Sequence, residues 1–322
     1  MTANKVALAA LALAFLFTSG CGNKAAAPPP PAKPAPPVEG APRIVTSGDG
    51  VHIEYHVYGS GDPAIVLVHG WSCDSNYWRA QLADLKAKYT VVTLDLAGHG
   101  ASGRNRTVWS IGNYGEDVAS VVRQLPNRQV ILVGHSMGGP VALEAKQRIG
   151  DRVVGVVGVD TFKTIGLATP SRQQLDELVE PFRKDFIGHT RSFVAEYFFQ
   201  KNADPQFVRK VADDMALSPP EVAVPSILSL FEMDYPSVLQ TIHVPIIAIN
   251  SDLGGLTDDK RIRKTAPTFR VVTLTGVGHF LMLEDPKRFN ETLLQAIDSI
   301  QAAAPAAETP VSTAAVPVPA KS

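Results

Sequence analysis

A serine lies at the centre of a short glycine-containing motif whose residue types can support nucleophilic chemistry. Gly134-His135-Ser136-Met137-Gly138 has the pattern Gly-x-Ser-x-Gly. It follows the apolar run Val130–Val133, which favours a buried strand, and it precedes Val141–Ile149, which favours a helix. A tight turn in that context projects the serine hydroxyl above the sheet edge, and the two glycines remove side chains that would collide with it. We therefore take Ser136 as the candidate nucleophile.

A serine hydroxyl becomes an effective nucleophile only when a base removes its proton. His279 is our candidate base, because it lies in the glycine-containing segment Gly276–Phe280, directly after the last expected strand, Arg270–Leu274. Parallel strands end at one edge of a sheet, so this position brings His279 to the same edge as Ser136.

Two aspartates compete for the third role, which is to orient the imidazole and stabilise its cationic form. Asp160 ends the strand expected at Val153–Val159 and lies 24 residues after Ser136. Asp252 follows another expected strand and lies 27 residues before His279. The sequence leaves the choice between these two carboxylates open.

The candidate residues require a sheet whose strands end together. Continuously apolar strands that alternate with helical segments are typical of a mostly parallel sheet covered by helices on both faces, so we expect an α/β fold. The alternation stops between residues 161 and 242, where the pattern predicts a helical cap inserted between strands 6 and 7. The cap helices are expected at Ser171–Arg183, His189–Lys201, Asp204–Leu217 and Val224–Met233.

Over Arg43–Ala302 the chain resembles the α/β-hydrolase family, in its branch with a helical cap. The motifs that carry the resemblance are His69-Gly70-Trp71, Asp95-Leu96-Ala97-Gly98-His99-Gly100, Gly134–Gly138, and Gly276–Phe280 followed by Glu284-Asp285-Pro286. The resemblance implies that the backbone N–H groups of Trp71 and Met137 form an oxyanion hole. It also implies that the histidines of the first three motifs are structural supports and that no dissociable cofactor is needed.

The same resemblance bears on the nucleophile and on the acid. Dehalogenases and epoxide hydrolases of this fold use an aspartate where this chain has Ser136, which disfavours both activities. The family commonly places its acid in a Gly-x-x-Asp turn beyond the seventh strand, where this chain has Ser251 and Gly254. Asp252 is close to that position, whereas Asp160 matches the sixth-strand acid of haloalkane dehalogenases and some lipases.

The N-terminal segment resembles a bacterial lipoprotein signal peptide. Val6–Phe17 is an unbroken apolar run of 12 residues, too short to span a bilayer comfortably, and Thr18-Ser19-Gly20-Cys21 resembles a lipobox. We expect a signal peptide over residues 1–21 with lipidation at Cys21, a Pro/Ala-rich tether over 22–42, a hydrolase domain over 43–302 and a disordered tail over 303–322. This arrangement predicts a protein anchored in the bacterial cell envelope at the outer membrane, with secretion as the alternative.

Composition narrows the function classes. The net charge of −1 offers no electrostatic basis for nucleic-acid binding. Neither of the two cysteines, Cys21 and Cys73, has a neighbour at metal-ligand spacing, so no metal site is expected. The leading interpretation is a serine hydrolase that cleaves small to medium carboxylic esters through an acyl-enzyme. The same three residues acting on a lactone, amide, thioester or C–C bond, or in perhydrolysis, remain open, as does a ligand-binding or signalling protein of this fold.

Overall fold

The computed structural model describes residues 39–304, which form one eight-stranded sheet with helices on both faces. The spatial order of the strands is β1-β2-β4-β3-β5-β6-β7-β8. The pairings of β2 with β1 and β4 are antiparallel, and the other pairings are parallel. The strands are β1 Arg43–Thr46, β2 His52–Tyr58, β3 Ala64–Val68, β4 Thr90–Leu94, β5 Val130–His135, β6 Val153–Val159, β7 Ile246–Ser251 and β8 Phe269–Leu274.

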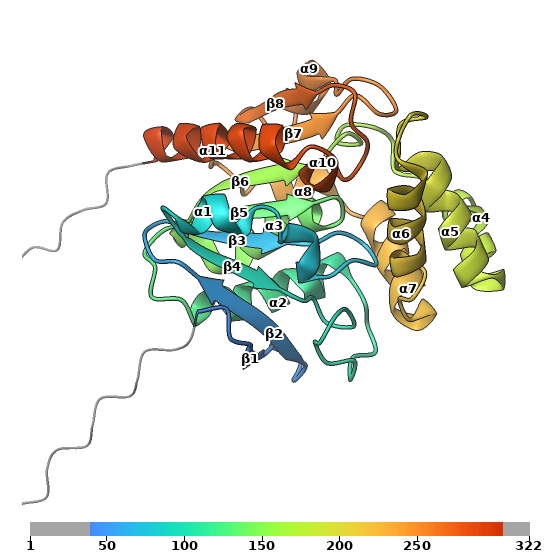
Figure 1. Cartoon of the computed structure of the whole chain (residues 1–322), viewed down its shortest axis with the longest axis horizontal. Coiled ribbons are helices and arrows are strands. Elements are labelled where there is room, and N and C mark those ends of the chain that lie inside the picture. The colour runs from blue at the N-terminus through green and yellow to red at the C-terminus, as the bar shows by residue number, and fades with distance from the viewer. Residues whose placement is uncertain (1–38, 305–322) are drawn as a thin grey trace, which may run out of the picture. The chain divides into compact units, whose positions relative to one another are not determined.

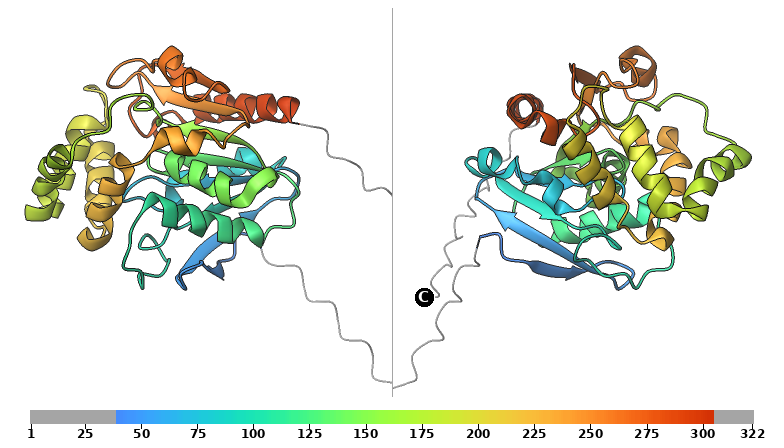
Figure 2. Two further views of the ribbon diagram at one scale, coloured as in Figure 1. Left: turned by 180° about the vertical axis from the view of Figure 1, so that it is seen from behind. Right: turned by 45° about the vertical axis from the view of Figure 1, so that its right-hand side comes forward.

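The helices follow the strands along the chain and cover the sheet. Every residue of β3, β4, β5, β6 and β7 is buried, as expected for parallel strands packed on both faces. The helices that cover the sheet and its edges are α1 Leu82–Lys86, α2 Ile111–Arg123, α3 Gly138–Ile149, α9 Asp259–Arg263, α10 Leu281–Glu284 and α11 Pro286–Ala303, with short 3-10 helices at Ser75–Trp78 and Gly150–Arg152. In Figure 1, α1 and α11 lie in front of the strands, and the view from behind in Figure 2 brings α2 and α3 to the front.

Five helices lie between β6 and β7 and make the cap. They are α4 Arg172–Lys184, α5 Phe186–Tyr197, α6 Pro205–Met215, α7 Pro220–Phe231 and α8 Tyr235–Leu239. Helices α4 to α7 gather at one end of the sheet, to the right in Figure 1. The expected α/β-hydrolase fold with a helical cap between strands 6 and 7 is therefore confirmed.

Several boundaries differ from those that the sequence predicted. The short edge strand β1 was not expected, since four residues carry too little pattern to be recognised. Helix α5 begins at Phe186 instead of His189, because the Asp185 side chain caps it by accepting a hydrogen bond from the amide of Gly188. Helix α7 begins at Pro220, four residues early, because proline is well suited to a first helical turn.

The lipidation and signal-peptide predictions concern residues outside the described range. Residues 1–38 and 305–322 contain Cys21, the expected signal peptide, most of the tether and most of the tail, so these assignments and the envelope location stay predictions. Within residues 39–304, no helix combines the length and the apolarity needed to cross a bilayer.

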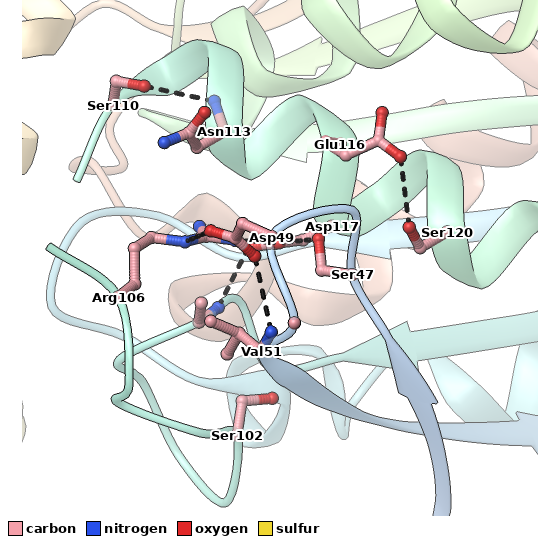
Figure 3. Close-up of polar contacts among 12 residues, drawn as sticks. Ser47, Asp49, Val51, Ser102, Arg106, Ser110, Asn113, Glu116, Asp117 and Ser120 are labelled. Carbon is pink, nitrogen blue, oxygen red and sulfur yellow. Dashed lines mark hydrogen bonds and ion pairs between the residues drawn. The ribbon is translucent and has the colours of Figure 1, made fainter. Parts of the chain in front are cut away.

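A buried ion-pair network ties the segment after β4 to α2 and to the turn between β1 and β2 (Figure 3). The guanidinium of Arg106 contacts both carboxylate oxygens of Asp117 and both of Asp49. The side chains of Arg106 and Asp117 are 2% and 0% exposed. Asp117 also accepts hydrogen bonds from Ser47 Oγ at 2.6 Å and from the amide of Ala97 at 3.2 Å. This network fixes the segment that contains the Asp95–Gly100 motif.

Replacing Arg106 by methionine should destabilise the fold strongly, because it leaves the Asp117 carboxylate buried without its cation. We expect a loss of about 3–5 kcal/mol in the free energy of unfolding, measured by urea denaturation. The matched control is Arg172→Met, whose side chain is 68% exposed in its ion pairs and should cost less than about 1 kcal/mol. Equal losses in the two variants would contradict this account of the network.

Candidate active site

The serine of the Gly-x-Ser-x-Gly motif lies in the tight turn between β5 and α3. Ser136 has φ 50°, a left-handed value that is uncommon for a residue with a side chain. A Cβ atom at Gly134 would lie 2.1 Å from the carbonyl oxygen of Gly138, and one at Gly138 would lie 2.4 Å from that of Val68. Only glycine fits either position, but a side chain would collide with these backbone carbonyls and not with the serine, as the sequence had suggested.

The ends of β5 and β6 bring Ser136 next to Asp160. The two strands pair in parallel with His135 opposite Val159, and the amide of Ser136 donates to the carbonyl of Val159 at 2.9 Å. Asp160 directly follows Val159. Both side chains line the same pocket.

His279 is hydrogen-bonded to Asp160 through Nδ1, which lies 2.6 Å from Oδ2. Their side chains are 12% and 5% exposed, so the contact is largely removed from water. A carboxylate at Nδ1 fixes the tautomer in which Nε2 is the nitrogen able to accept a proton. Asp160 is therefore placed to orient this imidazole.

The second oxygen of Asp160 is also fully engaged. Oδ1 accepts from the amide and the hydroxyl of Ser251, both at 2.9 Å, and lies 2.9 Å from the ammonium of Lys163. Burial alone would raise the pKa of Asp160, but the hydrogen bond and charge of His279, together with the charge of Lys163, outweigh it and hold that pKa well below its usual value. Asp160 is an ionised carboxylate at neutral pH.

Asp252, the other candidate acid, is occupied elsewhere. Its Oδ1 accepts from the side-chain amide of Gln200 at 3.1 Å and from the backbone amide of Gly276 at 3.0 Å. Of these two candidate acids, Asp160 is hydrogen-bonded to His279 and Asp252 is not. The sequence left the choice between the two open, and this hydrogen bond favours Asp160 as the catalytic acid, a role that stays a prediction. Asp252 instead holds the start of the loop that carries the histidine.

The loop around His279 is held from both sides. The amide of His279 donates to the carbonyl of Phe198 at 2.7 Å, and the rings of these two residues lie 4.4 Å apart. Glu284 accepts from the amides of Gly278 and Phe280, the two neighbours of the histidine, at 2.8 and 3.1 Å. Since Phe198 follows α5 directly, the cap itself helps to position the imidazole.

The buried histidines of the other motifs act as supports, as the family resemblance implies. His135 Nε2 donates to the carbonyl of His279 at 2.9 Å, and burial lowers the pKa of His135 to about 3, so its ring stays neutral. His69 Nε2 accepts from the amide of Leu96 at 3.0 Å. Burial likewise lowers the pKa of His99 to about 3. These rings join the loops around the site and are not available as the base.

The two amides expected in the oxyanion hole belong to Trp71, which follows His69-Gly70 after β3, and Met137, at the start of α3. Over residues 39–304, neither amide has an acceptor within the protein. A Cβ atom at Gly70 would lie 3.3 Å from Cβ of Ser136, so the loop before Trp71 runs close to the serine. Two unpaired donors on either side of a serine are what a developing oxyanion requires.

The Trp71 side chain packs under the cap. Its Nε1 donates to the carbonyl of Ala223 in α7 at 2.7 Å, and its ring lies edge-on to Phe182, 5.5 Å away. Phe182 and Phe186 of the cap pack on each other and on this tryptophan, and Phe193 packs on Phe182. Phe231, at the end of α7, lines the pocket at Ser136.

Backbone strain is concentrated at this edge of the sheet. The non-glycine residues with positive φ in the described chain are Ser72, Ser136, Asp160 and Phe162, at 54°, 50°, 44° and 67°. Each lies in a loop that carries a candidate catalytic or oxyanion residue. Strained residues persist where the surrounding structure over-determines them, and they cluster at functional sites.

The pocket beside Ser136 has a volume of about 290 Å³. Residues of the segment after β6 and of α7 and its following turn enclose it, and its surface is mainly apolar. Its lining includes Ser136, Asp160, Phe162, Lys163, Leu167, Leu230, Phe231, Met233 and Tyr235. The arrangement presents a serine and a buried carboxylate to a pocket suited to a small organic molecule, and the carboxylate is hydrogen-bonded to His279.

The residues that hold the acid were not predicted from the sequence. Ser251 and Lys163 both contact Asp160 Oδ1, and Glu284 was noted only as part of a motif. A serine at the usual glycine position after β7 was a visible signal for a displaced acid. No pattern in the sequence indicated Lys163.

The chain belongs to the α/β-hydrolase family, whose model, described as "Alpha/beta hydrolase family", matches residues 65–292. It is 27% identical over 273 residues to a non-heme haloperoxidase of Rhodococcus erythropolis, covering 80% of this chain and 99% of the relative. It is 26% identical over 279 residues to a bifunctional esterase/perhydrolase of Acinetobacter calcoaceticus, covering 79% of this chain and 99% of the relative.

A thermophilic esterase from Thermogutta terrifontis has the same fold, with a TM-score of 0.70 and 21% identity over 81% of this chain and 99% of that one. Family membership and the esterase among the relatives support an enzyme of the α/β-hydrolase class.

Proposed function

We propose that this protein is a serine hydrolase that cleaves small to medium carboxylic esters through an acyl-enzyme on Ser136. The observation that carries the proposal is the hydrogen bond between His279 Nδ1 and Asp160 Oδ2, made at the sheet edge where Ser136 faces a pocket. The aspartate leaves Nε2 of the histidine as the proton acceptor. An imidazole oriented in this way is the base that a nucleophilic serine requires.

The reaction proceeds in two halves. Ser136 Oγ attacks the ester carbonyl carbon while His279 Nε2 takes the hydroxyl proton, and the amides of Trp71 and Met137 stabilise the resulting oxyanion. The C–O bond to the alcohol then breaks, and the alcohol leaves with the proton from His279. Water attacks the acyl-enzyme by the same route, with His279 again as base, and the carboxylic acid and the free serine are released.

The size and surface of the pocket set the substrate class. A volume of about 290 Å³ lies at the small end of the range for ligand pockets, so the apolar part of the ester is short to medium in length. Leu230, Phe231 and Met233 supply apolar contacts but no charge. We therefore expect neutral acyl groups to be preferred.

The test of this assignment is the rate of p-nitrophenyl ester hydrolysis as a function of acyl length. Leu230→Trp should fill the pocket, lowering kcat/KM for a C8 ester by about tenfold or more relative to a C2 ester, because a blocked apolar contact removes about 1–3 kcal/mol. Leu217→Trp is the matched control, since Leu217 is 78% exposed and outside this pocket. If the ratio of kcat/KM for the C8 ester to that for the C2 ester is unchanged in Leu230→Trp, this pocket does not bind the acyl group.

Perhydrolysis is the second candidate, supported by relatives named as a haloperoxidase and an esterase/perhydrolase. In that reaction hydrogen peroxide replaces water in the second half and releases a peracid from the same acyl-enzyme. Peracid formation measured alongside ester hydrolysis, in the presence of hydrogen peroxide, separates the two activities. Loss of both in the same serine variant would show that they share one intermediate.

A further inference from the structure

Lys163 lies three residues after Asp160, in the segment that leads from β6 into the cap. Its ammonium is 2.9 Å from Asp160 Oδ1, the carboxylate oxygen that His279 does not use. The same nitrogen donates to the carbonyl oxygens of Ser251 at 3.3 Å and Leu253 at 3.0 Å. Lys163 thus links the acid to the segment at the end of β7.

These contacts account for the whole hydrogen-bonding capacity of the ammonium. A lysine has three N–H donors and no acceptor, and the protein supplies three acceptors. Although the side chain of Lys163 lines the pocket, no donor is left for a carboxylate or phosphate on a substrate. The ammonium therefore pairs with the aspartate and not with a substrate in the pocket.

The backbone on either side of Lys163 is held as well. Asp160 and Phe162 both have positive φ, so this segment is strained where it leaves β6. The carbonyl of Lys163 accepts from the guanidinium of Arg261 at 2.6 Å, and that of Ile165 accepts from the same side chain at 3.1 Å. A strained carboxylate position needs such restraint to keep its geometry.

We propose that Lys163 is a positioning residue for the Asp160–His279 pair, which fixes the carboxylate against β7 and counteracts protonation of the imidazole. The proposal rests on the proposed function, because it assigns a role within the same site. The ammonium places a positive charge beside the pair, so removing it should change how the rate depends on pH.

Other charged or titratable groups also face the pair. His135 from β5 contacts His279 and stays neutral. Glu284 from α10 binds the amides beside the histidine, and burial raises its pKa. Asp252, beyond β7, binds the amide of Gly276. Lys163 is the cation whose ammonium reaches the carboxylate.

The test is the pH profile of kcat/KM for a p-nitrophenyl ester in wild type and Lys163→Met. Removing the ammonium should move the acid limb to higher pH by about half a unit to one unit, since the lysine is 28% exposed and its field is partly screened. On the plateau, kcat should fall by about tenfold, as for a member of a coupled network, with KM within about twofold. Lys163→Arg should return the limb toward its wild-type position. Lys184→Met, which removes a charge from a side chain that is 74% exposed on the cap, should change neither quantity.

Two results would overturn the proposal. An acid limb of Lys163→Met that coincides with wild type shows that the lysine does not act on the pair. A large rise in KM with unchanged kcat assigns Lys163 to substrate binding instead. If circular dichroism shows that Lys163→Met is unfolded, Lys163→Gln, which keeps polar donors without the charge, provides the same test.

A readout without turnover separates this proposal from the proposed function. The Nδ1 proton shared with Asp160 should give a low-field proton resonance, which is assigned by its loss in His279→Gln. Its pH dependence in wild type and Lys163→Gln reports the effect of the charge directly. If the wild type hydrolyses no ester, the proposed function fails. Even then, a difference in the pH dependence of this resonance between wild type and Lys163→Gln supports the role of Lys163, and identical pH dependence overturns it.

Discussion

Replacing Ser136 by alanine is expected to lower kcat/KM for short p-nitrophenyl esters by about 10⁴-fold or more, because the attacking oxygen is removed. The turn that carries the serine is defined by Gly134, Gly138 and the amide contact to Val159, none of which depends on the hydroxyl. The variant should therefore fold as wild type. The loss should appear in kcat, while binding in the pocket is retained.

The matched control for that result is Ser192→Ala, which removes an exposed hydroxyl on α5 that bonds only the carbonyl of Gly188. It should leave kcat/KM within about twofold of wild type, as expected of a surface substitution. Full esterase activity in a correctly folded Ser136→Ala protein would contradict the assignment of the nucleophile.

Asp160→Asn should lower kcat by about 10³–10⁴-fold, because an amide in place of the carboxylate favours the wrong histidine tautomer and no longer stabilises the imidazolium. The expectation follows from the 2.6 Å contact to His279 Nδ1 and from the burial of Asp160. Steady-state rates on a short ester, with folding checked by circular dichroism, measure the effect.

Asp252→Asn is the decisive companion variant. Its hydrogen bonds from Gln200 and from the amide of Gly276 can both be accepted by an asparagine carbonyl, so the rate should stay within about tenfold of wild type. A severe loss in Asp252→Asn together with a mild one in Asp160→Asn would reverse the assignment of the acid.

The Asp160 contact also predicts how stability depends on pH. The folded-state pKa of this carboxyl lies below its unfolded value, because His279 and Lys163 outweigh the effect of burial. Its contribution to stability is therefore present above the unfolded pKa, which is about 4, and is lost as the pH falls below it.

Much of the site could be predicted because the chemistry depends on local sequence patterns. The strand, the Gly-x-Ser-x-Gly turn and the following helix are adjacent in the chain, and a Cβ atom added at Gly134 would lie 2.1 Å from the carbonyl oxygen of Gly138. The position of His279 followed from a glycine-containing loop after the last strand. Both assignments rest on short-range patterns that a single sequence displays.

The identity of the acid could not be predicted for a physical reason. Asp160 reaches His279 because β6 pairs with β7 in a particular register, with Val159 opposite Ile249, and because the backbone at Asp160 adopts φ 44°. Neither the register nor the left-handed conformation is visible in the residues around position 160. The separation of Asp160 from Ser136 along the chain and that of Asp252 from His279 were equally plausible for a catalytic acid.

The boundaries of the cap were predicted less well than the sheet. Helices α4 and α7 contain Pro181 and Pro225, residues that usually indicate a helix end, and α7 began earlier than its apolar pattern suggested. Tertiary packing of α4 against α7 and of Trp71 against both outweighs these local preferences. The cap aromatics Phe182, Phe186 and Phe193 pack among themselves or on Trp71 and are not among the residues that line the pocket.

Covalent labelling by a fluorophosphonate tests the central claim most directly, because only a serine activated by a neighbouring base reacts rapidly with such a reagent. Mass spectrometry of the labelled protein should find the adduct on the peptide that contains Ser136. Labelling should be strongly slowed in His279→Ala and lost after heat denaturation. A folded wild-type protein that acquires no adduct, or acquires it on another residue, would contradict the account.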